Sequence, residues 1–492
     1  MSKPSRPRRS SSSSGRREFL ERVCMAGAAW ATRSIWSESV ALAAQSPQPG
    51  SADWSRYGFD LHNTRFNGQE NTLGRGTVDR LKLKWRHQIG APIQSTPLVI
   101  GDTLFVGAWD GHYYGLDSRT GERKWQYDAG VKPAPPFGLR EIRSSATYDN
   151  GKIFFGTGAG ELNCVDAATG RQIWKTQVDP DPSARISSTP NILGNRVFIG
   201  TSADNAQIAC LDAETGAVRW RFYVNPPDRS NGGGSVWTCA AVDEEQNIVY
   251  NVTGNPRTFN PPGPLLFTES ILANDLETGE LLWYDQVRKA DPFDLDFSCH
   301  PMIFDATSPG KRGASRNCVG AGSKGGFYTW DRYTGELLWK VMLTNRGIQG
   351  GLVWNSTAVA YNKVYAISNA VNEWTGRSEA GRAVGLSESV TAALHAFTGE
   401  IVWWRHNDAM NRSPACVANG VFYQTLIDGS LEALDAETGK TLWSSRLASS
   451  SHTGVVIANG ELYTTNGEPN AAPVSVDPNG NYFVYAYSID GQ

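Results

Sequence analysis

The chain of 492 residues lacks any run of about 20 apolar residues, the length that a membrane-spanning helix requires. We therefore expect no membrane span. The seven histidines show no spacing typical of a metal site, and no serine–histidine–aspartate arrangement of the hydrolase type is present. These absences count against an integral membrane protein, a histidine-based metalloenzyme and a serine hydrolase.

Cysteine is sparse and unclustered. The seven cysteines form no Cys-x-x-Cys, no Cys-x-x-Cys-His and no adjacent pair, so neither a zinc site nor a covalent c-type haem is indicated. Cys24 lies near the N-terminus. We expect the other six to be buried free thiols, with one disulfide as the alternative in an oxidising compartment. These six are Cys164, Cys210, Cys239, Cys299, Cys318 and Cys416.

The N-terminus resembles a twin-arginine export signal. SGRREFLERV (14–23) carries an arginine pair before Phe and Leu, and VALAA (40–44) offers a small-residue cleavage site. We expect residues 1–43 to be the signal and the protein to be periplasmic. The alternative is a disordered basic tail, because Arg33 and Glu38 interrupt the apolar stretch. Removing 1–43, with eight Lys/Arg and three Asp/Glu, changes the net charge from −3 to −8 and argues against a nucleic-acid partner.

One eleven-residue pattern, xxDxxTGxxxW, occurs seven times. Its Asp can cap a turn, its Gly can supply a positive φ, and its Trp can pack on the next unit. Another strand pair lies upstream of several copies, so each unit has four strands, as in a β-propeller blade. The copies span 115–125, 164–174, 210–220, 273–283, 329–339, 393–403 and 433–443, with His395 replacing the Asp once.

An eighth unit is split between the two ends of the chain. YFVYAYSIDGQ (482–492) stops at the turn, and LKLKW (81–85) can supply the missing Trp strand. Joining the first and last strands in one blade removes open sheet edges. We therefore predict an all-β chain whose residues 53–492 form one eight-bladed β-propeller, with the last blade closed by N- and C-terminal strands.

Candidate ligand-binding residues gather in long insertions between the repeats, where a rigid scaffold usually carries its site. Asn255 of TGNP offers an amide oxygen that suits Ca²⁺. Trp237 follows three glycines and offers a flat face for stacking. An ordinary turn and a core tryptophan are the structural alternatives.

Charged residues add to this set. Asp294 and Asp296 leave the same face of an extended segment, so a proton or a cation must relieve their repulsion. Lys324 and Arg143 suit carbonyl and carboxylate oxygens, although solvated surface cations are the structural alternative. Together with Trp237, these residues would serve an acidic, planar, metal-bound ligand.

The motifs resemble those of the pyrroloquinoline quinone (PQQ) dependent alcohol dehydrogenases, and PFDLDF and GGLVW are most similar to the polyvinyl alcohol dehydrogenase branch. The resemblance implies oxidation of an alcohol, secondary or polymeric, with electrons passed to an external cytochrome c or another acceptor. The segments that carry it are DWSRYGFDLHNTRFN (53–67), GGGSVW (232–237), TGNP (253–256), PFDLDF (292–297), SKGGFYTWD (323–331) and GGLVW (350–354).

The resemblance also implies roles for individual residues. Asp294 would be the catalytic base, and Asn255, Asp294 and Asp296 would hold the metal. The metal would be Ca²⁺, with a lanthanide as the alternative because some relatives mark lanthanide use by a second Asp two residues after the base. The residues implied to contact PQQ are Gln94, Arg143, Ser188, Trp237, Lys324 and Trp354.

The sequence departs from the family pattern at two points. No Glu stands where the family usually supplies a further metal ligand, and Asp204 or Asn205 is the candidate stand-in. The adjacent cysteine pair of many members is also absent. The alternative function is a non-catalytic propeller scaffold of the outer-membrane assembly type, which shares the repeat but has no need for a ligand site.

Overall fold

The computed structural model describes residues 52–131, 141–203, 205–225, 233–256, 265–289, 295–310, 313–323, 326–343, 351–352, 357–370, 389–467 and 480–492. The chain divides into residues 1–48 and residues 49–492, and every described residue belongs to the second unit. The predicted signal peptide (1–43) therefore lies outside the described residues. In the part of the chain that is described, no helix has the length and apolarity that crossing a membrane requires.

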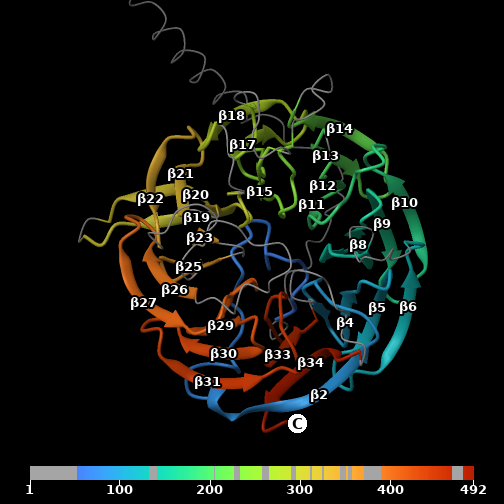
Figure 1. Ribbon diagram of the computed structural model, residues 1–492, viewed down its shortest axis with the longest axis vertical. Helices are drawn as coiled ribbons and strands as arrows, with labels where there is room; N and C mark the ends of the chain where they lie inside the picture. Colours follow the sequence, from blue (N-terminus) through green and yellow to red (C-terminus); the bar gives the residue numbers. More distant parts are fainter. Residues whose placement is uncertain are drawn as a thin grey trace, which may run out of the picture. The chain divides into compact units, whose positions relative to one another are not determined.

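The second unit is a ring of eight β-sheets, viewed along its axis in Figure 1. In each blade the consecutive strands pair antiparallel, with the first strand nearest the centre and the last at the rim. This arrangement confirms the predicted eight-bladed, all-β propeller.

The first four blades have identical strand order. They consist of β3 (Leu98–Ile100), β4 (Thr103–Gly107), β5 (His112–Asp117) and β6 (Arg123–Asp128); β7 (Ala146–Asp149), β8 (Lys152–Gly156), β9 (Glu161–Asp166) and β10 (Gln172–Gln177); β11 (Asn191–Leu193), β12 (Arg196–Gly200), β13 (Gln207–Asp212) and β14 (Val218–Tyr223); and β15 (Ala241–Asp243), β16 (Ile248–Val252), β17 (Ser270–Asp275) and β18 (Leu281–Gln286).

The next three blades follow the same plan, with one additional strand in each of the last two. They consist of β19 (Met302–Thr307), β20 (Ser315–Ser323), β21 (Gly326–Asp331) and β22 (Leu337–Val341); β24 (Ala358–Ala360), β25 (Lys363–Ala370), β26 (Ser389–His395) and β27 (Ile401–Asn407), with β23 (Gly351–Leu352) also on β25; and β28 (Cys416–Ala418), β29 (Val421–Thr425), β30 (Ser430–Asp435) and β31 (Thr441–Arg446), with β1 (Phe66–Asn67) parallel to β28.

The eighth blade joins the two ends of the propeller. It holds β32 (Val456–Ala458), β33 (Glu461–Thr465), β34 (Tyr482–Ile489) and β2 (Leu81–Ile89), which follows the 3₁₀ turn η1 (Val78–Arg80). β2 pairs antiparallel with β34, from Leu81 opposite Ile489 to Ile89 opposite Tyr482. The predicted closure by N- and C-terminal strands is therefore confirmed.

The repeated turn is built from local hydrogen bonds. In the third blade, Asp212 Oδ1 accepts the backbone N–H of Thr215 at 2.9 Å and its hydroxyl at 3.0 Å. The N–H of Gly216 donates to the Asp212 carbonyl at 2.8 Å, with a φ of 72° that favours glycine. Where His395 replaces the Asp, its Nδ1 accepts the N–H of Phe397 at 3.2 Å, so the turn survives the exchange.

The tryptophan of each repeat joins its blade to the next one. Trp220 donates its indole N–H to the Leu276 carbonyl at 3.1 Å, and its ring lies against Gly279, where a Cβ would come within 2.5 Å. The same indole–carbonyl bond recurs at all eight blade junctions, at 2.9 to 3.2 Å. Its donors are Trp85, Trp125, Trp174, Trp220, Trp283, Trp339, Trp403 and Trp443.

The segment 52–67 contacts the innermost strand of every blade, and its blue trace lies near the middle of the ring (Figure 1). Six of these contacts are backbone hydrogen bonds of 2.8 to 3.1 Å, and Arg56 and Asn67 make the other two with their side chains. The partners are Val99, Tyr148, Ile192, Val242, Ile303, Val359, Val417 and Ile457.

Two fully buried side chains fix this segment in place. Arg65 donates to the carbonyls of Tyr57, Ala415 and Val455, the last at 3.1 Å. Asn63, at a φ of 59°, donates its amide to the carbonyls of three residues that precede inner strands: Cys239, Ala240 and Pro301. The segment therefore acts as a hub for the inner strands.

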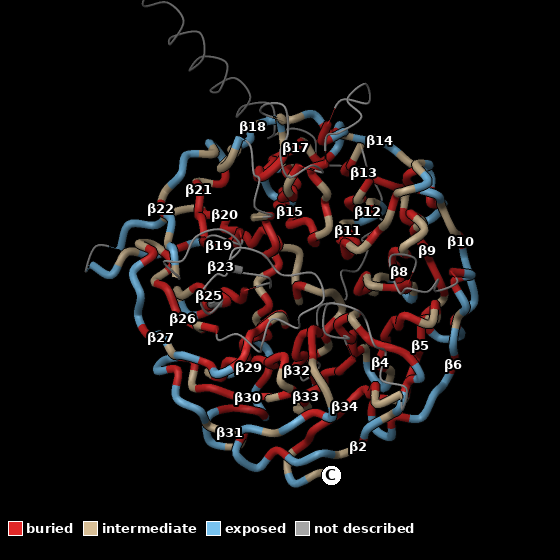
Figure 2. The backbone as a smooth tube through the Cα atoms, viewed as in Figure 1, coloured by how far each residue is buried: buried red, intermediate tan, exposed pale blue. Residues whose placement is uncertain are grey.

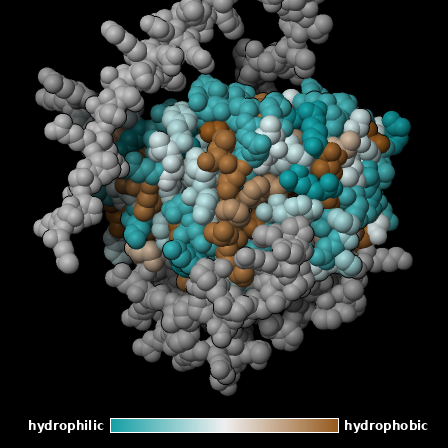
Figure 3. All heavy atoms as spheres, turned by 90° about the horizontal axis from the view of Figure 1, so that it is seen from above, coloured by the Kyte–Doolittle hydropathy of each residue, from teal (hydrophilic) through white to brown (hydrophobic). Residues whose placement is uncertain are grey.

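Burial follows the blade order. The inner strands are buried and the outer strands alternate, as Figure 2 shows from centre to rim. Figure 3 shows one side of the rim, on which a hydrophobic band crosses a mostly hydrophilic surface. Large exposed apolar side chains on the outer strands include Tyr223, Leu282, Tyr284, Leu337, Ile401 and Trp404.

We predict that Gly279→Ala destabilises the ring through its junction. An alanine at a φ of 75° costs about 1–2 kcal/mol, and the overlap with Trp220 adds about 1–3 kcal/mol. Gly151→Ala is the matched control, because Gly151 has a φ of 78° and no atom lies within 4 Å of the point that a Cβ would occupy there. Denaturant unfolding measures the free energy of unfolding of both variants. An equal decrease in the two variants would show that the glycine–tryptophan contact contributes nothing to stability.

Candidate active site

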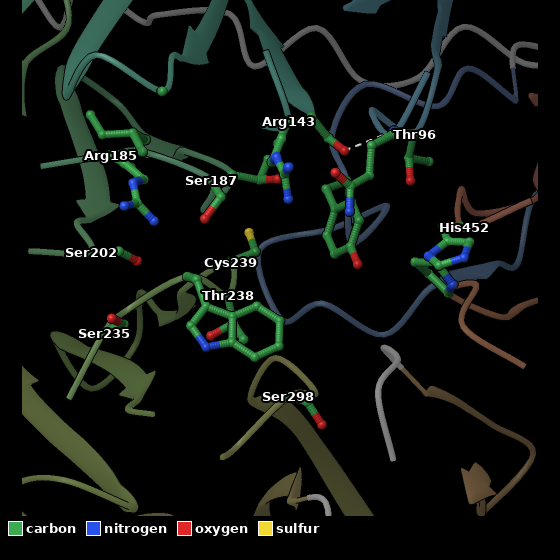
Figure 4. Close-up of a pocket in the computed structure, with 18 of the residues that line it drawn as sticks. Thr96, Arg143, Arg185, Ser187, Ser202, Ser235, Thr238, Cys239, Ser298 and His452 are labelled. Atoms are coloured by element: carbon green, nitrogen blue, oxygen red, sulfur yellow. Dashed lines mark hydrogen bonds between the residues drawn. The ribbon is translucent and has the colours of Figure 1, made fainter. Parts of the chain in front are cut away.

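A cavity of about 500 Å³ lies where the entrances to the inner strands converge. Its lining comes from the segments that lead into the first strands of seven blades, from loops that follow second strands, and from Tyr57 of the segment 52–67. Figure 4 shows polar side chains from these segments surrounding a central space. The repeat therefore sets one position per blade from which a residue can reach the same ligand.

The structure brings five of the predicted site residues to this cavity: Gln94, Arg143, Trp237, Asn255 and Asp296. Ser188 is buried instead, and its hydroxyl donates to the Gly200 carbonyl at 2.6 Å, while its neighbours Ser187 and Thr189 line the cavity. The predicted cofactor contact of Ser188 stays a prediction.

Three predicted residues, Asp294, Lys324 and Trp354, lie outside the described residues. The same holds for Asp204, one of the two candidate stand-ins for the missing Glu. The other, Asn205, forms a β-bridge with Gly233. The roles predicted for these residues stay predictions.

Asn255 and Asp296 meet directly at the cavity. The backbone N–H of Asn255 donates to Asp296 Oδ1 at 2.5 Å, and Asp296 is 7% exposed. A Cβ on Gly254 would lie 2.5 Å from the same oxygen, so the contact requires glycine at that position. Asn255 brings an amide oxygen and Asp296 a carboxylate to this cavity, and these are donor types that a hard cation prefers.

Asn255 and Asp296, the oxygen pair of the cavity, offer two of the ligands that the predicted metal site needs. Among the described residues, no three His, Cys, Asp or Glu side chains gather closely enough to hold a metal ion. Any cation at this position therefore needs oxygen ligands besides those of Asn255 and Asp296.

Arg143 is held at the cavity wall by two neighbours. Its Nη2 lies 2.7 Å from Oε1 of Glu141, whose side chain is almost fully buried. Its guanidinium also lies over the ring of Trp109, 4.4 Å from the centroid. These contacts orient the guanidinium before any ligand arrives.

The sequence reasoning missed two further arginines of the cavity, Arg185 and Arg412. The backbone of Arg185 exchanges two hydrogen bonds of 2.9 Å with Ser202, which fixes its position. A signal was present, because Arg143, Arg185 and Arg412 each precede a short serine-containing segment that leads into an innermost strand.

His452 also lines the cavity and was missed. Burial, followed by the charges of Arg412 and Arg143, lowers the pKa of His452 well below its ordinary value. The imidazole is therefore neutral near pH 7. Burial also lowers the pKa of Arg412, because the charged guanidinium loses hydration there.

The lining fits an acidic planar cofactor bound with a cation. Ligand pockets commonly span about 300–1,000 Å³, and this cavity falls within that range. Trp237 offers an aromatic face, Arg143, Arg185 and Arg412 offer guanidinium donors for carboxylates, and the oxygen pair of Asn255 and Asp296 suits a hard cation. This donor set matches the chemistry of PQQ and its metal ion.

The chain matches two family models. Residues 54–350 match the model described as glucose/ethanol/alcohol dehydrogenase, beta-propeller domain. Residues 348–478 match the model described as outer membrane protein assembly factor BamB. The first match spans more than half of the chain and contains all the predicted site residues except Trp354.

Curated relatives are alcohol dehydrogenases by name. The chain is 25% identical to a polyvinylalcohol dehydrogenase of Pseudomonas sp over 66% of this chain and 56% of the relative. It is 27% identical to the quinohemoprotein alcohol dehydrogenase ADH-IIG of Pseudomonas putida over 60% of this chain and 46% of the relative. A lanthanide-dependent methanol dehydrogenase of Methylacidiphilum fumariolicum is 26% identical over 59% of this chain and 54% of the relative. The matches thus span about half the length of these relatives.

Solved structures share the fold. The quinohemoprotein alcohol dehydrogenase ADHIIG from Pseudomonas putida superposes with a TM-score of 0.77 at 20% identity, covering 90% of this chain and 81% of that one. BamB from Moraxella catarrhalis superposes with a TM-score of 0.56 at 16% identity, covering 83% and 99%. At these identities the likeness establishes the propeller fold alone.

The cysteines of the described residues are all free and buried, as expected. Burial raises the pKa of the Cys239 thiol, at the cavity wall, to about 12. The thiolate, which is the reactive form, therefore forms only near that pH.

We predict that Cys239 in the folded protein resists iodoacetamide at pH 8 and reacts after unfolding in guanidinium chloride. Mass spectrometry of the labelled peptides measures both states. Rapid labelling of Cys239 in the folded protein would contradict the protonated, buried thiol.

Proposed function

The chain belongs to the glucose/ethanol/alcohol dehydrogenase β-propeller family, and from this membership we propose that it is a PQQ-dependent alcohol dehydrogenase. The reaction is the two-electron oxidation of an alcohol to a carbonyl compound. The observation that carries the proposal is the convergence of Gln94, Arg143, Trp237, Asn255 and Asp296 on one cavity. They come from four blades, and a propeller without a ligand has no physical reason to gather them.

The cavity residues have complementary roles in this proposal. Trp237 stacks on the ring system, and the guanidinium of Arg143, already oriented by Glu141 and Trp109, binds a carboxylate. Gln94, Ser188, Lys324 and Trp354 are further proposed contacts. PQQ with its metal ion supplies the two-electron acceptor when bound.

The proposed base and two of the three proposed metal ligands lie on one segment of the chain. Asn255, Asp294 and Asp296 hold the cation, and Asp294 accepts the proton of the substrate hydroxyl. Ca²⁺ is the proposed ion. The relative named as a lanthanide-dependent methanol dehydrogenase supports a lanthanide as the alternative.

The proposal also includes the alcohol substrate, the electron acceptor and the cellular location. The relative named as a polyvinylalcohol dehydrogenase supports a secondary or polymeric alcohol as substrate. The sequence holds no Cys-x-x-Cys-His motif, so we propose that the electrons pass to an external cytochrome c or another acceptor. The twin-arginine-type signal in 1–43 supports a periplasmic location.

A non-catalytic scaffold is the competing function. The match of residues 348–478 to the BamB model favours it. A scaffold does not require the cavity residues, so binding of PQQ discriminates between the two functions.

We expect PQQ to quench tryptophan fluorescence in a metal-dependent titration, and the protein to oxidise one member of an alcohol panel with a dye acceptor. The titration is run without metal, with Ca²⁺ and with La³⁺. Trp237→Phe should reduce the quenching, whereas Trp404→Phe, at a rim residue that is 64% exposed, should retain it. Absence of binding with every metal would leave the scaffold as the better function.

We further expect Asp294→Asn to lower turnover by at least about 100-fold, because general base catalysis contributes about 10²–10⁴-fold. The unfolding midpoint should not change. Asp408→Asn is the control, since that side chain is fully exposed. Ordinary turnover by Asp294→Asn would remove its assignment as the base.

A further inference from the structure

A buried ion pair lies behind the oxygen pair of the cavity. Nη1 of Arg288, just after β18, lies 2.9 Å from Oε2 of Glu269, whose side chain is fully buried. The same nitrogen donates to the Leu295 carbonyl at 3.2 Å and to Ser323 Oγ at 2.9 Å. Neither Arg288 nor Glu269 lines the cavity. One guanidinium therefore links three separate segments of the chain.

These contacts close a ring of six residues. The N–H of Glu269 donates to the Gly254 carbonyl at 2.9 Å, and the N–H of Asn255 donates to Asp296 Oδ1 at 2.5 Å. Peptide bonds join Gly254 to Asn255 and Leu295 to Asp296. The ring runs through Asn255, Asp296, Leu295, Arg288, Glu269 and Gly254, so the two cavity residues are held from both sides.

The rest of the fold holds the Asp296 segment firmly against β20. The backbone N–H groups of Ser298 and Cys299 both donate to the Gly322 carbonyl at 3.0 Å, and Ser323 Oγ donates to the Leu295 carbonyl at 3.2 Å. The Asn255 segment comes from a different blade. Besides the direct contact of Asn255 with Asp296, Glu269 and Arg288 form a bridge between the two segments.

We propose that Arg288 and Glu269 are positioning residues that set the placement of Asn255 relative to Asp296 and thereby the affinity for the cation. This inference rests on the proposed function and adds to it two residues that touch neither cofactor nor metal. Hydrogen-bond partners behind metal ligands commonly change metal affinity by about 10- to 100-fold. The ion pair supplies the charge-assisted bonds that make such a support rigid.

A purely structural role is the competing explanation, and a charge-neutral variant separates the two. In Arg288→Met, the buried carboxylate of Glu269 loses the guanidinium of Arg288. Removing one partner of such a pair destabilises the folded protein whether or not the pair positions a ligand. Adding Glu269→Gln removes that buried charge, so the double variant should regain stability. It does not restore the bond of Arg288 to the Leu295 carbonyl, so the bridge from Glu269 to the Asp296 segment stays broken.

The experiment measures Ca²⁺ affinity in the presence of PQQ by calorimetry, together with the unfolding midpoint. Arg288→Met and the double variant Arg288→Met/Glu269→Gln should both bind Ca²⁺ about 10- to 100-fold more weakly. Arg405→Met is the matched control, because Arg405 pairs with Glu432 at 3.1 Å in a similarly buried site away from the cavity. It should bind Ca²⁺ as the unaltered protein does.

Hydrogen exchange of the Asn255 amide in the ligand-free protein provides a second readout. Exchange should accelerate in both Arg288 variants and not in Arg405→Met. Unaltered Ca²⁺ affinity in the double variant, or unaltered Asn255 exchange, would overturn the positioning role. If the unaltered protein binds neither PQQ nor Ca²⁺, the proposed function fails, and the exchange measurement still decides whether the ring positions Asn255.

Discussion

The ring depends on the contact that each repeat tryptophan makes with the next blade, and at seven of the eight junctions the indole ring also lies against a glycine of that blade. The indole donates to a carbonyl of the neighbouring turn while its ring occupies the space that a Cβ would fill, as Trp220 does at Gly279 and Leu276. Because the indole–carbonyl bond recurs at all eight junctions, every blade is joined to its neighbour in the same way. The inner strands then have to converge, and their entrances form a common cavity.

The centre of the ring is fixed by different means. The segment 52–67 connects the inner strands, and its fully buried Arg65 donates to carbonyls that precede the inner strands of the seventh and eighth blades. Its Tyr57 also lines the cavity. One short segment therefore both joins the inner strands and contributes to the wall of the site, so the shape of the cavity depends on closure of the whole ring.

The sequence predicts the features that are set by residues close together in the chain better than the contacts between residues far apart in it. The blade repeat, the split eighth blade and the place of Trp237, Asn255 and Asp296 follow from turn chemistry and motif order, which act over a few residues. Ser188 faces away from the cavity although Ser187 and Thr189 line it, because a shift of one residue in an extended segment reverses the side-chain direction. The hub and the Arg288–Glu269 bridge were not predicted, since their partners are far away in the chain.

The distribution of charge around the cavity explains why a ligand would bind in one orientation. Figure 4 places Arg143 and Arg185 across the cavity from Ser298, which belongs to the same segment as Asp296. The arginine side presents guanidinium groups, one of which is paired with Glu141, while the opposite side presents the carboxylate of Asp296. A planar ligand with carboxylates at one edge and a cation at the other satisfies both sides in a single orientation. Turning it over would set carboxylates against Asp296 and the cation against the arginines, and this electrostatic cost selects one orientation.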